Sequence, residues 1–255
     1  MQSDAKRGPS EASIETFELS GRAIDLTAEA VWSALRCGGF LNSAVVGERF
    51  DELFQLGRFL IDLRALARLP REGELEATER SLLPAPIRDA EHLWVCVATA
   101  GEAIDRRARA FREEGDVINS MILDAIAMAG LSSIAERLGR KIFEWAADRR
   151  LAASRSFAPG AGASHWDLEH QRLVFDHLPD RPLGVELTDR FLMRPSKSLS
   201  FVIGVGGGVE QACLPFSCAG CARVDCAYRH IPKEETVRGA ETESGRSDGD
   251  PPIDV

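Results

Sequence analysis

The sequence predicts an α+β fold with a mostly antiparallel sheet flanked by helices, and three observations lead to that prediction. Long stretches have apolar residues at helical spacing, and short apolar runs between turn residues are typical of buried strands. The strand-like runs do not alternate regularly with the helical stretches, as they would in a doubly wound parallel sheet. We therefore expect helices, a strand pair, further helices, a loop and a last group of strands, in that order.

Two helices are predicted in the first part of the chain. Thr27 has the side chain to cap a helix that continues to Cys37, and Gly38 then stops it. A second helix is predicted over residues 45–69, and Pro70 ends it. Its apolar residues recur at helical spacing: Phe50, Leu53, Phe54, Phe59, Leu60, Leu63 and Leu66.

The middle of the chain combines a strand region with two more helices. Residues 73–98 are predicted to be extended, because Leu75 and Ala77 alternate with glutamates and the run 93–97 is suited to a buried strand. A charged amphipathic helix is predicted over residues 102–114. The following helix, residues 117–151, has almost no polar face in its first half and therefore belongs in the middle of the domain.

The remaining elements are short. Residues 156–164 form a loop rich in Gly, Ala and Pro, and a short helix is predicted over residues 166–178. Strands are predicted over residues 184–188 and 198–205. The glycine-rich stretch 204–208 lacks the spacing of a phosphate-binding loop, so we interpret it as a plain turn.

Charge and hydropathy exclude two classes of partner. The net charge is −9, of which residues 233–255 hold −4 with seven acids and three bases. A phosphate backbone requires a basic face, so we expect no nucleic-acid partner. Apolar stretches such as 93–100 fall far short of the roughly 20 residues of a membrane span, and the N-terminus has no apolar signal region. We expect a cytoplasmic protein that does not bind membranes.

Six cysteines are distributed unevenly along the chain. Cys37 and Cys96 are isolated among apolar residues and are predicted to lie in the core. The other four fall within fourteen residues and suit zinc or an iron–sulfur cluster, since both take tetrahedral sulfur: Cys213, Cys218, Cys221 and Cys226. His230 could replace Cys213 as a ligand, and the alternatives to metal are reduced thiols or a Cys218–Cys221 redox pair.

Histidines and tryptophans have simpler interpretations. The histidines of the 165–177 region, His165, His170 and His177, are expected to face solvent, because no further ligand stands at a fixed spacing from them. Three tryptophans are expected to anchor the core or an interface: Trp94, Trp145 and Trp166.

Several motifs resemble the reactivation domain of cobalamin-dependent methionine synthase, which binds S-adenosylmethionine. In that family an Arg-x-x-Pro-Gly-Tyr loop precedes a short helix, as Pro159-Gly160 does here. A Leu-Thr-Glu-Ser…Met-x-Pro…Ser-Val-Ser segment then leads into a strand, and residues 187–200 have a similar pattern. Asp124-Ala-Ile-Ala in the central helix and Cys218-x2-Cys221-x4-Cys226-Ala-Tyr-Arg229 resemble free-standing members of the family. The resemblance extends over about residues 90–230.

The resemblance implies both a fold and an activity. The family's fold is a twisted antiparallel sheet with helices, and it holds S-adenosylmethionine against a corrinoid that another domain carries. When the cobalt has been oxidised, an electron from a reductase and a methyl group from S-adenosylmethionine restore methylcobalamin. This chain has no Asp-x-His-x-x-Gly corrinoid motif, so a partner must supply the cobalamin.

The resemblance also assigns ligand-binding positions. The family's arginine four residues before the glycine of the loop falls on Ser156, its tyrosine on Ala161, and a glutamate of the central helix on Ser132. Pro159 and Gly160 keep the backbone pattern of the loop. Arg155 could replace the arginine if the loop slips by one residue. We therefore expect S-adenosylmethionine binding to be weak or lost, with Arg155, Pro159, Gly160, Ala161 and Ser132 as the binding positions.

The predicted function is that of an accessory activation protein for a corrinoid-dependent methyltransferase, with methionine synthase the first candidate and an electron donor as a second partner. The alternatives are a non-enzymatic binding or assembly module and an iron–sulfur electron-transfer protein that acts on a corrinoid protein. Along the chain we expect a disordered N-terminus (1–13), an N-terminal helical part (14–89), an activation-domain-like core (90–210), a Cys-rich metal-binding segment (211–230) and a disordered acidic tail (231–255).

Overall fold

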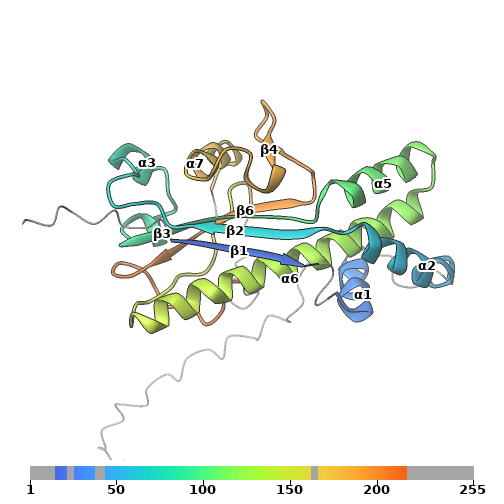
Figure 1. Cartoon of the computed structure of the whole chain (residues 1–255), viewed down its shortest axis with the longest axis horizontal. Helices are drawn as coiled ribbons and strands as arrows, with labels where there is room; N and C mark the ends of the chain where they lie inside the picture. The colour runs from blue at the N-terminus through green and yellow to red at the C-terminus, as the bar shows by residue number, and fades with distance from the viewer. Residues whose placement is uncertain (1–14, 22–25, 38–43, 162–165, 217–255) are drawn as a thin grey trace, which may run out of the picture.

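The computed structural model describes residues 15–21, 26–37, 44–161 and 166–216 (Figure 1). The predicted disordered segments 1–13 and 231–255 lie outside these residues, as does the Cys-rich segment beyond residue 216.

A four-stranded antiparallel sheet forms the centre of the molecule. Its order is β1 (Thr16–Gly21), β2 (Leu63–Arg68), β3 (His92–Thr99) and β6 (Ser198–Val205). The register is continuous across the sheet, with Cys96 opposite Ala67 on β2 and Phe201 on β6. The predicted α+β fold with a mostly antiparallel sheet is confirmed.

The outer edge of β6 is covered by the chain itself. Residues 152–157 run antiparallel to β6, with isolated bridges that pair Ala153 with Val205 and Phe157 with Val202. On its other side this segment bonds to the chain that follows β6. The Ala212 N–H donates to the Ala153 carbonyl at 2.9 Å, and the Ser156 N–H donates to the Pro215 carbonyl at 2.8 Å. The predicted loop therefore begins as an extended segment with neighbours on both sides.

One face of the sheet is covered by helices. The long α6 (Val117–Asp148) lies along the sheet below the strands in Figure 1. The core on this face also includes residues of α1 (Ala28–Cys37), α2 (Ala44–Leu60) and α5 (Glu102–Glu113). Gly130 allows α6 to approach Ile61 closely, because a Cβ at this position would lie 2.6 Å from Ile61 Cδ1. Among the described residues α6 alone is long and apolar enough to span a membrane, but half of its apolar window is buried, as in a core helix.

The opposite face is covered by shorter elements. They are α3 (Ala77–Ser81), α4 (Ala85–Arg88), η1 (Leu168–His170), α7 (Gln171–Asp176), η2 (Pro182–Gly184) and a hairpin of β4 (Glu186–Leu187) and β5 (Met193–Arg194). Because both faces are covered, β3 is buried from Leu93 onward. Its side chains alternate between the two cores: Trp94, Cys96 and Ala98 on the α6 side, and Leu93, Val95 and Val97 on the other.

Tryptophans anchor the cores, as predicted. Trp94 has no exposed surface, stacks on Phe17 of β1 with the ring centroids 4.7 Å apart, and meets the edge of Trp145 at 5.3 Å. Trp166 is buried in the core on the other face. The prediction that Cys96 is a core residue is also confirmed, and burial raises the pKa of its thiol.

Two predicted element boundaries were wrong. The helix predicted over residues 45–69 ends at Leu60, and Leu63–Arg68 is strand β2. In that strand Leu63, Ala65 and Ala67 join the core on the α6 side while Leu66 joins the other, which is the two-residue period of a strand. The region 73–98 is not extended before β3, because α3 and α4 form there. A reciprocal capping box between Glu76 and Glu79 starts α3, and Pro84 precedes α4.

The expectation that the histidines face solvent fails for His177. This side chain is buried, and its Nε2 lies 3.0 Å from Oε1 of Glu79 on α3. The carbonyl of the same residue accepts a hydrogen bond from Arg68 at 2.8 Å. His170 is half-buried and stacks on Trp166, while His165 lies outside the described residues.

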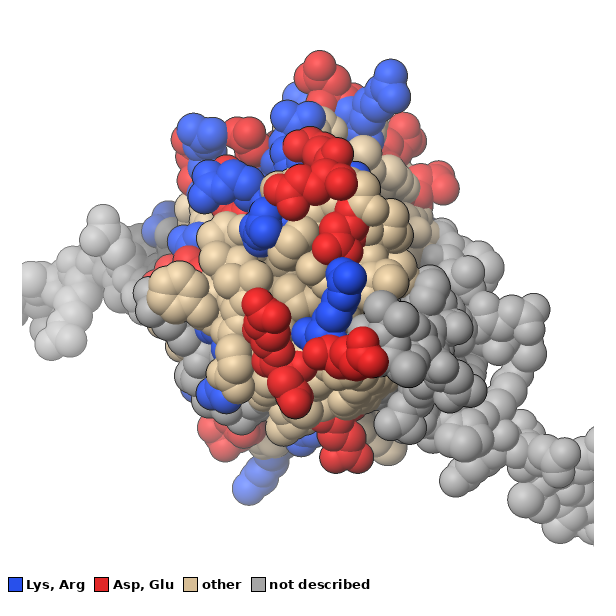
Figure 2. All heavy atoms as spheres, turned by 90° about the vertical axis from the view of Figure 1, so that its right-hand side faces the viewer, with Lys and Arg blue, Asp and Glu red and all other residues tan. Residues whose placement is uncertain are grey.

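The charged surface is mixed at one end of the molecule. Figure 2 shows this end, on the right of Figure 1, with basic and acidic side chains interspersed around an area of uncharged residues. Such exposed pairs are screened by water and contribute little to stability.

We expect Trp94→Ala to lower the free energy of unfolding by about 3–5 kcal/mol, because it leaves a cavity against Phe17 and Trp145. The matched control is Phe59→Ala, which removes an aromatic side chain that is 74% exposed and should change stability little. Chemical denaturation followed by circular dichroism measures both. Equal losses for the two variants would contradict the assignment of Trp94 to the core.

Candidate functional site

A cleft with a volume of about 880 Å³ opens beside the start of β6. Its walls come from separate parts of the chain: β2, the first turns of α5, α7, and the segment that runs from residue 181 to residue 196. Seven charged side chains line it: Arg64, Arg109, Arg181, Arg194, Glu102, Asp105 and Glu186. A second cleft of about 510 Å³ lies between α7 and the hairpin, and Arg181, Glu186 and Thr188 line both clefts.

A glycine places the first turn of α5 at the cleft. Gly101 follows β3 with a φ of +87°, and a Cβ there would lie 2.9 Å from the Cβ of Asp62. A side chain at this position would therefore be both strained and obstructed. The helix begins at the next residue, so Glu102 and Asp105 lie in its first turn, where the helix dipole favours acids.

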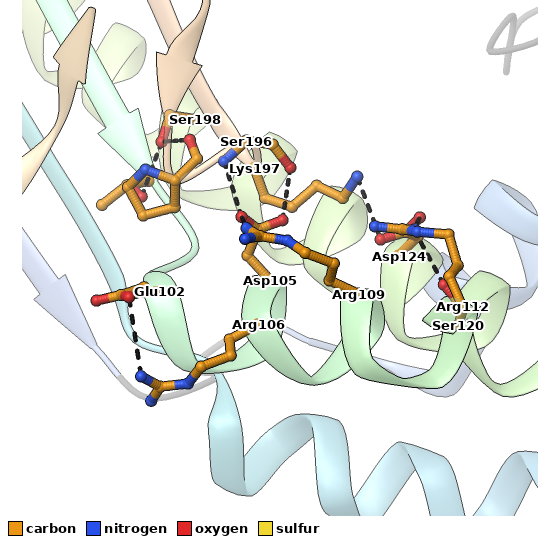
Figure 3. Close-up of polar contacts among 12 residues, drawn as sticks. Glu102, Asp105, Arg106, Arg109, Arg112, Ser120, Asp124, Ser196, Lys197 and Ser198 are labelled. Carbon is orange, nitrogen blue, oxygen red and sulfur yellow. Dashed lines mark hydrogen bonds and ion pairs between the residues drawn. The ribbon is translucent and has the colours of Figure 1, made fainter. Parts of the chain in front are cut away.

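Asp105 holds the loop between β5 and β6 in place. Its side chain is only 3% exposed. Oδ1 accepts a hydrogen bond from Ser196 Oγ at 2.5 Å, and Oδ2 accepts bonds from the Ser196 N–H at 3.1 Å and from Arg109 at 3.3 Å (Figure 3). Burial raises the pKa of Asp105, but the bonds from Ser196 and the charges of Arg109 and Lys197 outweigh it and hold this pKa below its ordinary value. The carboxylate is therefore charged near neutral pH, and it accepts three hydrogen bonds.

A second carboxylate ties the same loop to the central helix. Asp124 of α6 lies 3.2 Å from Lys197 Nζ and 2.9 Å from the guanidinium of Arg112, which also donates to Ser120 at 3.0 Å (Figure 3). Asp124 begins one of the stretches that carry the family resemblance. In the structure it links α6 to α5 and to the start of β6.

Three residues around the two clefts have strained backbone. Arg181, Leu183 and Phe191 have φ values of +46°, +57° and +58° without being glycine. Such conformations are uncommon for residues with a Cβ and are found most often where a ligand binds or a segment switches. Each of the three lines at least one of the two clefts.

The positions predicted to bind S-adenosylmethionine lie elsewhere. The Arg155 guanidinium lies 4.1 Å from the centroid of the Phe157 ring, and one of its nitrogens is 3.4 Å from the Ser156 carbonyl. Pro159 is buried, and Gly160 is exposed with a φ of +75°. The Gly160 N–H donates to the Trp166 carbonyl at 2.8 Å, and the Ala161 N–H donates to the Ala158 carbonyl at 3.2 Å.

Ser132 completes the predicted set and is separated from that loop in the fold. It is exposed on α6, whereas a Cβ at Gly160 would contact Leu168 of η1, on the opposite side of the sheet from α6. None of the five predicted binding positions lines either cleft.

Only the first cysteine of the predicted metal site is described. Cys213 is exposed, and Cys218, Cys221 and Cys226 lie outside the described residues. Within the part of the chain that the structure describes, no three His, Cys, Asp or Glu side chains come together in a way that could hold a metal ion. Metal binding at the Cys cluster stays a prediction.

Sequence reasoning did not single out the arginines of the large cleft. They are contributed by β2, α5, the turn before η2 and β5, so no local spacing connects them. The one available signal was the Met193-Arg194-Pro195 stretch, which belongs to the family pattern.

Comparison with known proteins supports the fold. No protein-family model and no curated protein matches the sequence of this chain. The structure, with its antiparallel sheet and flanking helices, has a reactivation-domain-like fold. It is similar to the crystal structure of the MetH reactivation domain bound to AdoHcy, with a TM-score of 0.54 and 15% sequence identity. The match covers 79% of this chain and 81% of that chain, and at this identity it shows the fold alone.

We expect Asp105→Asn to lower the free energy of unfolding by about 1–3 kcal/mol near neutral pH, because the charged partner of Ser196 and Arg109 is lost. The lowered pKa of Asp105 means that its contribution is present above about pH 4 and is lost as the pH falls through the folded-state pKa. The difference between wild type and variant should therefore shrink in acid. Glu102→Gln, at a 74% exposed side chain of the same helix turn, is the control. A stability difference that does not change with pH would show that Asp105 acts by packing alone.

Proposed function

We propose that this chain is an accessory activation protein for a corrinoid-dependent methyltransferase, with methionine synthase the first candidate. The observation that carries the proposal is the likeness of the fold to the MetH reactivation domain over 79% of the chain. The order of sequence motifs supports it independently, because Pro159-Gly160 and the segment 187–200 follow one another as they do in that family.

An S-adenosylmethionine-like ligand is the first candidate for the small molecule, since the similar domain was solved with AdoHcy bound. When bound, such a ligand supplies a methyl group. In this chain Arg155 is the cation closest in sequence to the predicted loop position that could hold a carboxylate, and Gly160 offers an exposed backbone. Ser132 and Ala161 provide no charge. The residues fit such a ligand only in part, and we therefore propose weak binding.

The corrinoid would come from a partner protein, because the chain has no corrinoid-binding motif. The role of this chain would then be to present a ligand and to dock, which are orienting tasks. An electron donor would be the second partner. The cysteines from Cys213 to Cys226 would serve either as a zinc-bound docking segment or as the ligands of an iron–sulfur cluster.

A second candidate function is an assembly module that has lost its small ligand. The surroundings of Arg155 favour it, because the guanidinium already lies against the Phe157 ring. A cation held over an aromatic face gives up part of that contact when it turns towards a ligand.

We expect calorimetric titration with S-adenosylmethionine to give a dissociation constant in the high micromolar range or weaker, since two lost charge-assisted hydrogen bonds weaken binding by about two to four powers of ten. Arg155→Ala should abolish the remaining binding. Arg106→Ala, at a 71% exposed side chain on α5, is the matched control and should leave it unchanged. Low-micromolar affinity that does not depend on Arg155 would place the ligand elsewhere.

We further expect a corrinoid-binding methyltransferase to co-purify with the chain from its native host under anaerobic conditions. The corrinoid absorption spectrum and mass spectrometry of the captured proteins identify it. Retained capture by Arg155→Ala would favour the assembly module, whereas joint loss of capture and S-adenosylmethionine binding would favour the activation protein. Repeated purification without any corrinoid protein would contradict both.

A further inference from the structure

We propose that the 880 Å³ cleft beside the start of β6 binds a small organic anion, that is, a carboxylate or phosphate group attached to an apolar body. The volume lies in the range of sites that bind small molecules. This inference goes beyond the proposed function, because none of the positions assigned to S-adenosylmethionine lines this cleft.

Hydrogen-bond donors exceed acceptors in the cleft. Three of its arginines each have one acidic partner: Arg64 lies 3.1 Å from Asp62, Arg109 lies 3.3 Å from Asp105, and Arg181 lies 2.6 Å from Glu186. A guanidinium has five N–H donors, so in each pair the arginine keeps N–H groups that its acidic partner does not occupy. The Asp105 carboxylate already accepts three bonds and has little left to offer a ligand.

Arg194 gives the cleft its surplus charge. Among the described residues its guanidinium has no acidic partner, while Glu102 of the same cleft is paired with Arg106 outside it. Arginine binds carboxylate and phosphate through two parallel hydrogen bonds, which a lysine cannot provide. The cleft therefore favours a ligand with a planar carboxylate or a phosphate over a cation or a neutral sugar.

An apolar strip lies beside these arginines. Leu183, Leu192 and Met193 line the same cleft, and Leu192 is 54% exposed. A large apolar side chain that lines a cleft gains from being covered, because burial removes its surface from water. Leu183 is one of the strained residues, so the backbone holds this one side chain of the strip in an uncommon conformation.

Polar contacts hold one wall of the cleft, around Asp105 and Ser196, in place. Asp105 fixes Ser196 by two hydrogen bonds, and the neighbouring Lys197 is tied to Asp124 of α6. A preorganised wall lowers the entropic cost of binding. The arginines of the cleft therefore stand beside a wall whose polar contacts are already made without a ligand.

The test is calorimetric titration of the full chain with four probes: octyl phosphate, octanoate, inorganic phosphate and uncharged octyl glucoside. We expect at least one octyl anion to bind more tightly than inorganic phosphate and than octyl glucoside, and the two octyl anions distinguish a phosphate from a carboxylate group. Arg194→Gln should weaken binding of the preferred anion about tenfold or more. Arg194→Lys, which keeps the charge, should recover part of the loss.

Two further variants make the test specific to the cleft. Arg172→Gln changes a 77% exposed arginine that lines the smaller cleft and should have no effect. Leu192→Ala should weaken the octyl anions and leave inorganic phosphate unchanged. The proposal is overturned if neither octyl anion binds, if octyl glucoside binds as tightly, or if Arg172→Gln and Arg194→Gln have equal effects.

Discussion

The burial of β3 on both faces is the constraint on which the rest of the structure depends. A strand with a core on each side has little room for polar side chains, and from Leu93 to Thr99 this one has no exposed residue and only Thr99 is polar. Polar groups cannot be placed along such a strand without a partner. Polar side chains therefore lie where the strands end. The cleft opens at this end of the sheet, where Thr99 pairs with Ser198 at the start of β6.

The same constraint explains why the polar groups at the cleft form a network instead of scattered pairs. Asp105 enters a nearly closed environment and needs donors from more than one element, so the loop at Ser196 and Arg109 of α5 both converge on it. The next residue, Lys197, forms an ion pair with Asp124 of α6 instead. One short loop thus joins the outer strand, a surface helix and the central helix. Both helices are therefore linked to the start of β6 by hydrogen bonds and an ion pair as well as by packing.

The sequence alone predicted the elements whose pattern is local. The apolar first half of α6, the amphipathic α5 and the uninterrupted apolar run of β3 could each be recognised within one window. β2 was assigned to a helix, because its alternation spans six residues and its leucines also continue the spacing of α2. β1 was not predicted, since Phe17 and Leu19 alone do not distinguish a strand. The cleft could not be predicted, because Arg64 and Arg194 come together only through the pairing of β2, β3 and β6.

The pairing of β3 with β6 also has a consequence for synthesis of the protein. His92 lies opposite Val205 and Thr99 opposite Ser198, so about a hundred residues separate the two strands along the chain. While the ribosome makes α5 and α6, β3 has no neighbour on that side, and its backbone groups form an open apolar edge. Chains emerge from the N-terminus onward, and such edges promote aggregation. The nascent protein is therefore most exposed to aggregation until β6 has been made.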